Sequence, residues 1–173
     1  MKFKIRTAKQ EDCKEISRMI MDLAVYEKMP EQVKISHREL ERDGFCHNPF
    51  FECLVAEVPE EHKSSQGHTT VGYALYFYTY STWKGPSVFI EDLYVMPEYR
   101  GKGIGSSLMA KVAQVGKEKQ CVRLQLSVLD WNTPSLDFYV RKGAQDLTAS
   151  EGWHALRFDG EALDKLAAEA PKD

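Results

Sequence analysis

The stretch EDLYVMPEYRGKGIGS, residues 91–106, decides the fold more than any other part of the sequence. It starts in an apolar run that predicts a strand over Val88–Val95 and opens into a helix with Ile104 and Leu108 on one face. Between them, three glycines at alternate positions let a backbone approach a ligand without Cβ clashes. Free amides and the positive end of the helix dipole favour a phosphate at such a turn.

The two common phosphate-binding loops do not match this stretch. The P-loop pattern G-x-x-x-x-G-K-[ST] is absent, and the third glycine comes one residue early for G-x-G-x-x-G. On the glycines alone, a tight turn that only packs the helix closely remains the alternative. The strand-loop-helix context and the charges of Arg100 and Lys102 favour an anion site.

Working outward from this stretch, hydrophobic periodicity and turn residues predict alternating strands and helices. Helices are expected from the cap at Asp12, and over Ser36–Arg42, Ile104–Val115, Pro134–Lys142 and Glu161–Ala168. Strands are expected over Phe3–Arg6, Phe50–Val58, Val71–Tyr80, Val88–Val95, Val122–Leu129, Ala144–Leu147 and His154–Phe158. This order predicts an α/β (mixed α+β) fold, with a central mixed sheet of about seven strands and helices on both faces.

Composition narrows the class of protein. The 173 residues suit one domain, residues 1–173, and the net charge of -3 leaves no basic footprint for nucleic acid. No run approaches the roughly 20 apolar residues of a membrane span, and the N-terminus lacks a signal peptide. The four cysteines and five histidines show no metal-ligand spacing. We therefore expect a cytoplasmic protein without metal, membrane or nucleic-acid partners.

The turn resembles a known signature. Arg100–Gly105 is similar to the R/Q-x-x-G-x-G/A motif of the GCN5-related N-acetyltransferases (GNAT). Further segments resemble the spermidine/spermine acetyltransferase subfamily, among them Tyr26-Glu27, residues 43–45 and 48–50, Trp131-Asn132 and residues 151–153. Residues 80–85, 95–100, 128–132 and 143–148 are more similar to its thialysine acetyltransferase branch. The resemblance implies a single N-acetyltransferase domain of GNAT fold, acetyl-CoA as co-substrate and a homodimer.

An alkyl amine, whose pKa is about 10, attacks a thioester only after losing a proton, so the site needs a base and an acid for the leaving thiolate. By pattern alone, Glu91 is an ordinary solvent-facing strand residue and Tyr139 a core tyrosine. The resemblance implies instead that Glu91 acts as base through water and that Tyr139 is the proton donor. Strand alternation places Asp92 on the face opposite Glu91.

The resemblance also implies which residues bind the two substrates. Cofactor-binding positions are the main-chain groups of the strand end, the glycine turn and the start of a later helix: Leu93, Tyr94, Val95, Arg100, Gly101, Lys102, Gly103, Ile104, Gly105, Ser106, Asn132, Thr133, Pro134 and Ser135. Amine-binding positions are Tyr26, Glu27, Trp83, Glu91, Gln125, Leu126, Ser127 and Glu151, although Ser127 departs from the apolar residue expected in the polyamine branch.

Thialysine is the favoured acceptor, with spermidine or spermine as the alternative. A protein or peptide N-acetyltransferase and a non-catalytic acetyl-CoA-binding module are the further alternatives.

Overall fold

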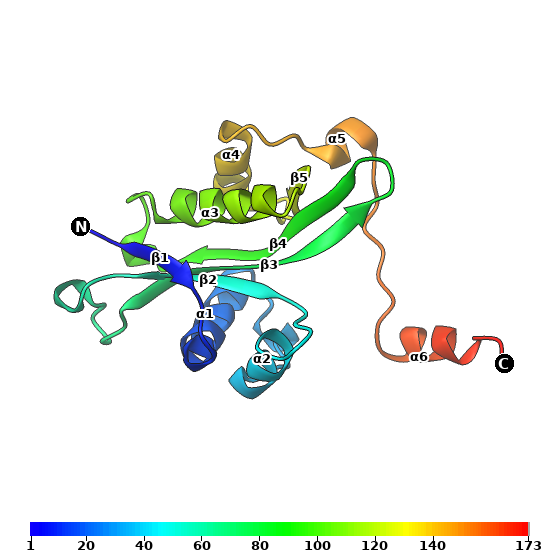
Figure 1. Cartoon of the computed structure of the whole chain (residues 1–173), viewed down its shortest axis with the longest axis horizontal. Coiled ribbons are helices and arrows are strands. Elements are labelled where there is room, and N and C mark those ends of the chain that lie inside the picture. Colours follow the sequence, from blue (N-terminus) through cyan, green and yellow to red (C-terminus); the bar gives the residue numbers. More distant parts are fainter. Residues whose placement is uncertain (173) are drawn as a thin grey trace. The chain divides into compact units, whose positions relative to one another are not determined.

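The computed structural model describes residues 1–172 and confirms the mixed α/β class (Figure 1). The chain divides into two compact units, residues 1–129 and residues 130–173. Each unit is described by itself below, the second over residues 130–172. The prediction of a single acetyltransferase domain over residues 1–173 stays a prediction.

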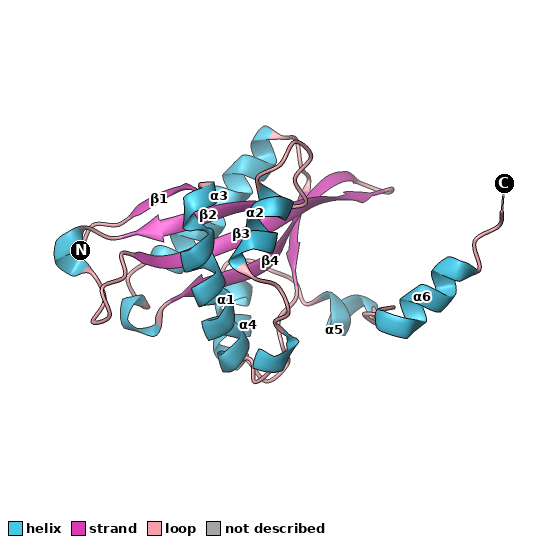
Figure 2. Ribbon diagram, turned by 90° about the horizontal axis from the view of Figure 1, so that it is seen from below, coloured by secondary structure: helices cyan, strands magenta, loops and turns pink. Residues whose placement is uncertain are grey.

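One five-stranded sheet forms the centre of the first unit. Its strands follow one another across the sheet in chain order, and the first four are antiparallel neighbours. Only β4 and β5 are parallel, joined by a helical crossover (Figure 2). The strands are β1 (Lys4–Thr7), β2 (Glu52–Glu57), β3 (Thr70–Ser81), β4 (Gly85–Val95) and β5 (Arg123–Leu126).

Three helices cover this sheet, with α1 and α2 on one face and α3 on the other (Figure 1). They are α1 (Cys13–Tyr26), α2 (His37–Gly44) and α3 (Ile104–Glu118), all where periodicity predicts them. At α2, the side chains of Ser36 and Glu39 form a capping box that fixes where the helix begins. Short 3-10 turns lie at Gln10–Asp12, Pro30–Gln32, Glu60–His62 and Pro97–Tyr99.

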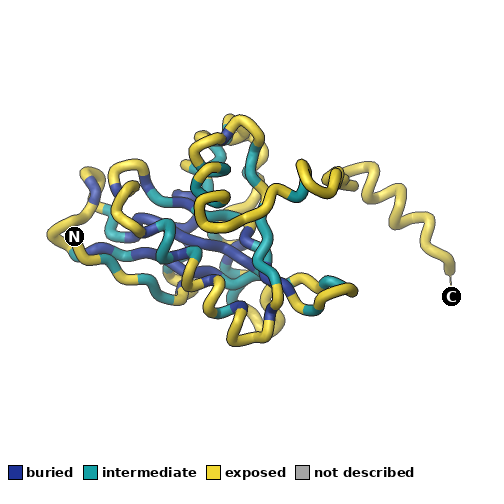
Figure 3. The backbone as a smooth tube through the Cα atoms, turned by 90° about the horizontal axis from the view of Figure 1, so that it is seen from above, coloured by how far each residue is buried: buried dark blue, intermediate teal, exposed yellow. Residues whose placement is uncertain are grey.

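The core of the first unit lies on both faces of the central strands, where β2 and the first half of β3 are almost wholly buried (Figure 3). On one face, Leu108 and Val112 of α3 are fully buried. At Gly116, a Cβ would lie 3.0 Å from Val88, so the missing side chain lets α3 approach β4 closely. On the other face, α1 buries Ile16 and Met19.

The second unit contains α4 (Thr133–Arg141), α5 (Leu147–Glu151) and α6 (Gly160–Ala168). The helices expected over Pro134–Lys142 and Glu161–Ala168 are confirmed.

The two strands expected in the second unit are absent from residues 130–172, so the structure has five strands rather than about seven. Where the first of these strands is expected, at residues 144–147, the side chain of Asp146 accepts hydrogen bonds from the amides of Thr148 and Ala149 and starts α5. At the second, Leu156 and Phe158 remain exposed. Their alternation indicates an extended chain, but a strand also requires a neighbouring backbone to bond with.

Within residues 1–172 no helix combines the length and the apolar character that a membrane span requires. The same part of the chain holds no group of three histidine, cysteine or acidic side chains arranged to hold a metal ion. All four cysteines are free thiols, three of them buried.

Candidate active site

A β-bulge at Glu91 interrupts the ladder between β3 and β4. Tyr76 pairs with Ile90, and the next residue of β3, Leu75, pairs with Asp92, so Glu91 is the additional residue of β4. The bulge breaks the strict alternation of side chains on which the expectation for Asp92 depends, so alternation does not by itself place Asp92 on the face opposite Glu91. Both carboxylates act on the same neighbour, because the charges of both raise the pKa of Glu27.

Glu27 lies at the end of α1, where its amide donates to the carbonyl of Leu23 and closes the helix. Its side chain is half-buried, and burial raises its pKa before the charges of Asp92 and Glu91 raise it further. The end of α1 and the bulge of β4 therefore bring acidic groups together from segments far apart in sequence. Such a group repels its own members and attracts a cation.

Beyond the bulge, β4 has an open edge. β5 pairs with β4 only over Ser87–Ile90, while β3 continues along β4 to Val95. Main-chain groups alternate between the two edges of a strand. The amide of Met96 donates to Val71 on the β3 side, and the carbonyl of Val95 points the other way. Leu93 lies two residues before Val95, so the main-chain groups of both residues face the open edge.

Arg100 links the glycine turn to the end of α1. Its Nε donates to the carbonyl of Val95 at 2.8 Å, and its guanidinium lies 5.7 Å from the ring centres of both Tyr26 and Tyr94. Cation–π contacts of this kind hold a side chain in place. The Arg100 charge is thus engaged by the protein, and the exposed Lys102 is the cation of the turn directed at solvent.

The glycines of the turn differ in what they require. Gly101 and Gly103 have φ angles of 77° and 87°, in the left-handed region that side chains other than glycine rarely adopt. Nothing lies within 4 Å of a Cβ at either position, so backbone conformation and not crowding selects glycine. Gly105 is helical, and a Cβ there would meet Val95 at an ordinary 3.7 Å.

Gly103 is also the N-cap of α3, and no side chain caps that helix end. The first bond within the helix runs from the amide of Ser107 to the carbonyl of Gly103 at 3.0 Å. The amides of the preceding residues in the first turn have no partner within the helix. Their dipoles and the nearby Lys102 make this end of α3 suitable for a phosphate group.

The end of β5 lies beside the bulge. Gln125 pairs with Phe89 and Leu126 with Ile90, so Ser127 follows at the point where β4 and β5 part. These candidates therefore lie close to Glu91, as the sequence predicts for a common site.

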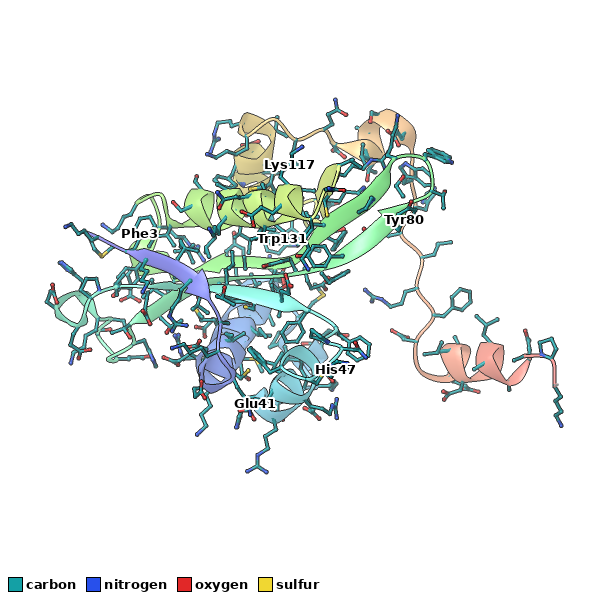
Figure 4. The ribbon with its side chains drawn as sticks, viewed as in Figure 1. Phe3, Glu41, His47, Tyr80, Lys117 and Trp131 are labelled. Atoms are coloured by element: carbon teal, nitrogen blue, oxygen red, sulfur yellow. The ribbon has the colours of Figure 1, made fainter. Side chains whose placement is uncertain are left out.

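Trp83 lies elsewhere. It occupies the turn between β3 and β4 and is 79% exposed. Tyr80, labelled in Figure 4, precedes the same turn at the tip of the hairpin. Glu91 is six residues further along β4 than Gly85, a span of roughly 20 Å in an extended strand. Within one chain, Trp83 is therefore not brought to the bulge.

The remaining candidates belong to the second unit. There, the side chain of Asn132 accepts a bond from the amide of Ser135 at 3.4 Å, with Pro134 in the first turn of α4. Tyr139 is half-buried, and its ring meets Phe138 edge-on, with 5.4 Å between centres. Glu151 is the last residue of α5, not part of a loop as expected, and it accepts a bond from the indole of Trp153 at 2.6 Å.

Comparison with known proteins adds an independent finding. The model of the Acetyltransferase (GNAT) family matches residues 8–144. The chain is 54% identical over 163 residues to the thialysine N-epsilon-acetyltransferase of Bos taurus, covering 94% of this chain and 96% of that protein. It is 42% identical to the spermidine/spermine N(1)-acetyltransferase-like protein 1 of Homo sapiens, covering 96% of this chain and 24% of that protein.

Among solved structures, an AAC(6')-Iy in complex with a CoA bisubstrate analog aligns with a TM-score of 0.71. The alignment covers 93% of this chain and 99% of that one, and 16% of residues are identical. At that identity the likeness concerns the fold alone.

Proposed function

This chain belongs to the GNAT acetyltransferase family, and we propose that it transfers the acetyl group of acetyl-CoA to a primary amine of a small diamine-like substrate, with thialysine favoured. The observation that carries the proposal is the bulge of β4. It gathers Glu91, Asp92 and Glu27 beside an open strand edge that leads directly into an uncapped glycine turn. A site for a cation and a site for a phosphate thus lie at the two ends of one short segment.

The residues of the first unit fit acetyl-CoA. The uncapped amides of α3, the left-handed Gly101 and Gly103, and Lys102 suit the pyrophosphate. Leu93 and Val95 offer main-chain groups to the pantetheine arm at the open edge. The carbonyl of Tyr94 lies against Gly72 of β3 instead, so we expect Tyr94 to contribute its ring, beside Arg100.

The residues proposed to complete the cofactor site are Ile104, Gly105 and Ser106 of the first unit and Asn132, Thr133, Pro134 and Ser135 of the second.

The chemistry requires a base that takes a proton from the ammonium and an acid that protonates the departing thiolate. When bound, acetyl-CoA supplies an activated thioester carbonyl as the acyl donor. Glu91 takes a proton from the ammonium through water, so that the amine reaches its neutral, nucleophilic form. Tyr139 gives a proton to the departing thiolate. In all, the nitrogen of the ammonium loses two protons: the first passes to Glu91 and on to solvent, and the second, lost after attack on the thioester, replaces the proton that Tyr139 gives to the thiolate. The net reaction converts an ammonium and a thioester into an amide, a thiol and one released proton.

Substrate preference follows from charge. Glu27, Glu91 and Asp92 create a negative region that favours a substrate with an ammonium group. Tyr26, Gln125, Leu126 and Ser127 are proposed to line the amine site beside these carboxylates. Glu151 and Trp83 remain proposed contacts; since Trp83 lies far from Glu91 along its own hairpin, its part depends on the proposed homodimer.

The test is an acetylation screen of lysine analogues, diamines and polyamines with the purified chain. Thialysine is expected to show the highest kcat/KM. Spermidine and spermine are the alternative acceptors, which the 42% identical relative favours. A spermidine kcat/KM exceeding that of thialysine by about a hundredfold, roughly 2.7 kcal/mol, would overturn the choice of thialysine. Histone or ribosomal peptides acetylated as fast as small amines would instead support a protein acetyltransferase.

A single substitution separates the enzyme from a module that only binds acetyl-CoA. Tyr139→Phe is expected to lower kcat by about one to two orders of magnitude while CoA binding persists, because only the proton donor is lost. An unchanged kcat would remove Tyr139 from the mechanism. We further propose a cytoplasmic homodimer, which light scattering on the purified chain and imaging in cells would test.

A further inference from the structure

We propose that Tyr73 and Asp92 are positioning residues for Glu91 and Glu27: their hydrogen bond fixes the bulge of β4 and holds a negative charge directly behind it. This inference rests on the proposed function, in which Glu91 and Glu27 act on the amine. Neither Tyr73 nor Asp92 is expected from the sequence, because the alternation of an uninterrupted strand separates Asp92 from Glu91.

Tyr73 of β3 and Asp92 of β4 lie next to each other across the ladder. Tyr73 lies opposite Tyr94, and Asp92 lies opposite Leu75, so the two residues are diagonal neighbours on one face of the sheet. The hydroxyl of Tyr73 donates to Oδ2 of Asp92 at 2.8 Å. This bond joins the two strands immediately beyond Glu91, where β4 has lost its partner β5. After the bulge, this side-chain bond supplies part of the support that pairing with β5 gives to β4 before the bulge.

Burial restricts the movement of both residues of the pair. Tyr73 is fully buried, so its hydroxyl has no alternative partner in solvent and breaking the bond leaves a buried polar group unsatisfied. The other buried neighbours on this face, Cys53 of β2 and Val55 opposite Tyr73, leave the ring little freedom to move. The Asp92 carboxylate is therefore held at one position behind the bulge.

Asp92 interacts electrostatically with titratable groups on the neighbouring elements. Burial raises the pKa of Asp92, the Tyr73 hydrogen bond opposes this, and the charge of Glu91 adds to it. On α1, burial raises the pKa of Glu27, and the charge of Asp92 is the next largest cause of that rise. From β2, burial raises the pKa of the Cys53 thiol and the Asp92 charge adds to it. Asp92 thus influences the pH range over which Glu27 ionises.

The experiment separates position from charge with two nearly isosteric variants. Tyr73→Phe removes the hydrogen bond, whereas Asp92→Asn keeps an acceptor for Tyr73 but removes the charge. Tyr78→Phe is the matched control: it also lies on β3 and its hydroxyl also donates to a carboxylate, Glu52, at 2.7 Å, but β3 presents it on the opposite face. Steady-state kinetics with acetyl-CoA and thialysine, and in parallel spermidine, are measured from about pH 5.5 to 9 on the full chain.

We expect Tyr73→Phe to lower kcat about tenfold with the KM for acetyl-CoA unchanged, because Glu91 is no longer fixed. We expect Asp92→Asn to shift the acid limb of kcat/KM to lower pH by about half a unit, because the Asp92 charge raises the pKa of Glu27 and its loss lowers that pKa. Tyr78→Phe is expected to follow the wild-type profile. Profiles of all three variants that superimpose on the wild type would overturn the proposal.

A readout without substrate distinguishes this inference from the proposed function. In the wild-type chain and in Asp92→Asn, carboxyl NMR follows the titration of Glu27, whose midpoint is expected to fall in the variant by about half a unit. An unchanged midpoint would overturn the inference even for an active enzyme. A wild-type chain that acetylates no amine in the screen, but shows the shifted midpoint, would overturn the proposed function and leave the Tyr73–Asp92 pair confirmed.

Discussion

The two halves of β4 differ in their neighbours and in their use. Over Ser87–Ile90 the strand has a partner on each side, and Val88 and Ile90 are 1% and 2% exposed. Over Leu93–Val95 it has only β3, and the open edge leads to the glycine turn. Glu91 lies between the halves as the bulge residue.

This difference shows how one strand can serve both the core and the candidate active site. The paired half anchors the sheet under α3, so the open half can leave main-chain groups unpaired without unfolding the strand. The bulge is the boundary, and the charges of Glu91 and Asp92 there act on Glu27 at the end of α1. If this division is correct, changes in the paired half should affect stability, and changes in the open half should affect activity.

The largest effect is expected from Ile90→Ala in the paired half. Removing a fully buried side chain between β3 and β5 is expected to lower the free energy of unfolding by about 2–5 kcal/mol, from lost burial and the cavity left behind. Urea denaturation followed by circular dichroism measures this. A loss below about 1 kcal/mol would contradict the view that this half anchors the sheet.

Glu91→Gln tests the boundary between the halves. We expect kcat/KM for thialysine to fall about a hundredfold at neutral pH, equivalent to about 2.7 kcal/mol, because the base is lost. The variant should recover part of its rate as the pH rises, since the neutral fraction of the amine rises with it. Its free energy of unfolding should change by less than about 0.5 kcal/mol, because Glu91 is exposed. Equal losses of stability and activity would argue against the division.

Gly103→Ala tests the turn at the end of the open half. A left-handed residue other than glycine costs about 1–2 kcal/mol, and the weakened turn should raise the Kd for CoA about tenfold. Isothermal titration calorimetry measures the Kd. Gly105→Ala is the matched control: the residue is helical and its new Cβ would have an ordinary contact, so its effect on the Kd should be much smaller. Similar effects of both would mean that crowding, and not backbone conformation, selects glycine.

Among the principal effects of these four substitutions, that of Asp92→Asn is expected to be the smallest, and it should increase stability. The pKa of Asp92 is raised, chiefly by burial, so folding favours its protonated form. Its ionisation therefore destabilises the fold as the pH rises from the unfolded pKa, about 4, through the raised folded value. At pH 7 the variant should be more stable than the wild type by about 1 kcal/mol, and the difference should vanish near pH 4. A variant less stable than the wild type at pH 7 would show that the Tyr73 bond outweighs the burial of the charge.

Much of the fold follows from local patterns. The periodicity of α1 and α3 and the apolar runs of β2 to β5 predict these elements within a few residues, because each pattern records which face of its own segment is buried. The two C-terminal strands were predicted wrongly for a related reason. The alternation of Leu156 and Phe158 describes an extended segment, but pairing depends on a neighbouring backbone that no local pattern describes.

The candidate site also contains residues that the sequence predicts and residues that it does not. The glycine turn and Glu91 were found from the sequence and the family resemblance. Tyr73 and Asp92 were missed, because a bulge shifts the alternation on which the prediction for Asp92 depended. The one available signal was the Glu91-Asp92 pair itself: two successive acids in an otherwise apolar strand are difficult to accommodate unless the strand is interrupted.

By itself, the sequence determined the mixed α/β class and the strand–turn–helix stretch over residues 91–106, with its glycine turn. These features depend on neighbours along the chain, and local sterics and periodicity are sufficient to specify them. The tertiary structure alone decided that β4 loses its second partner after Ile90, that Tyr73 reaches across to Asp92 and that the end of α1 brings Glu27 beside them. Those contacts join residues far apart in sequence, and only packing of the whole sheet brings them within reach.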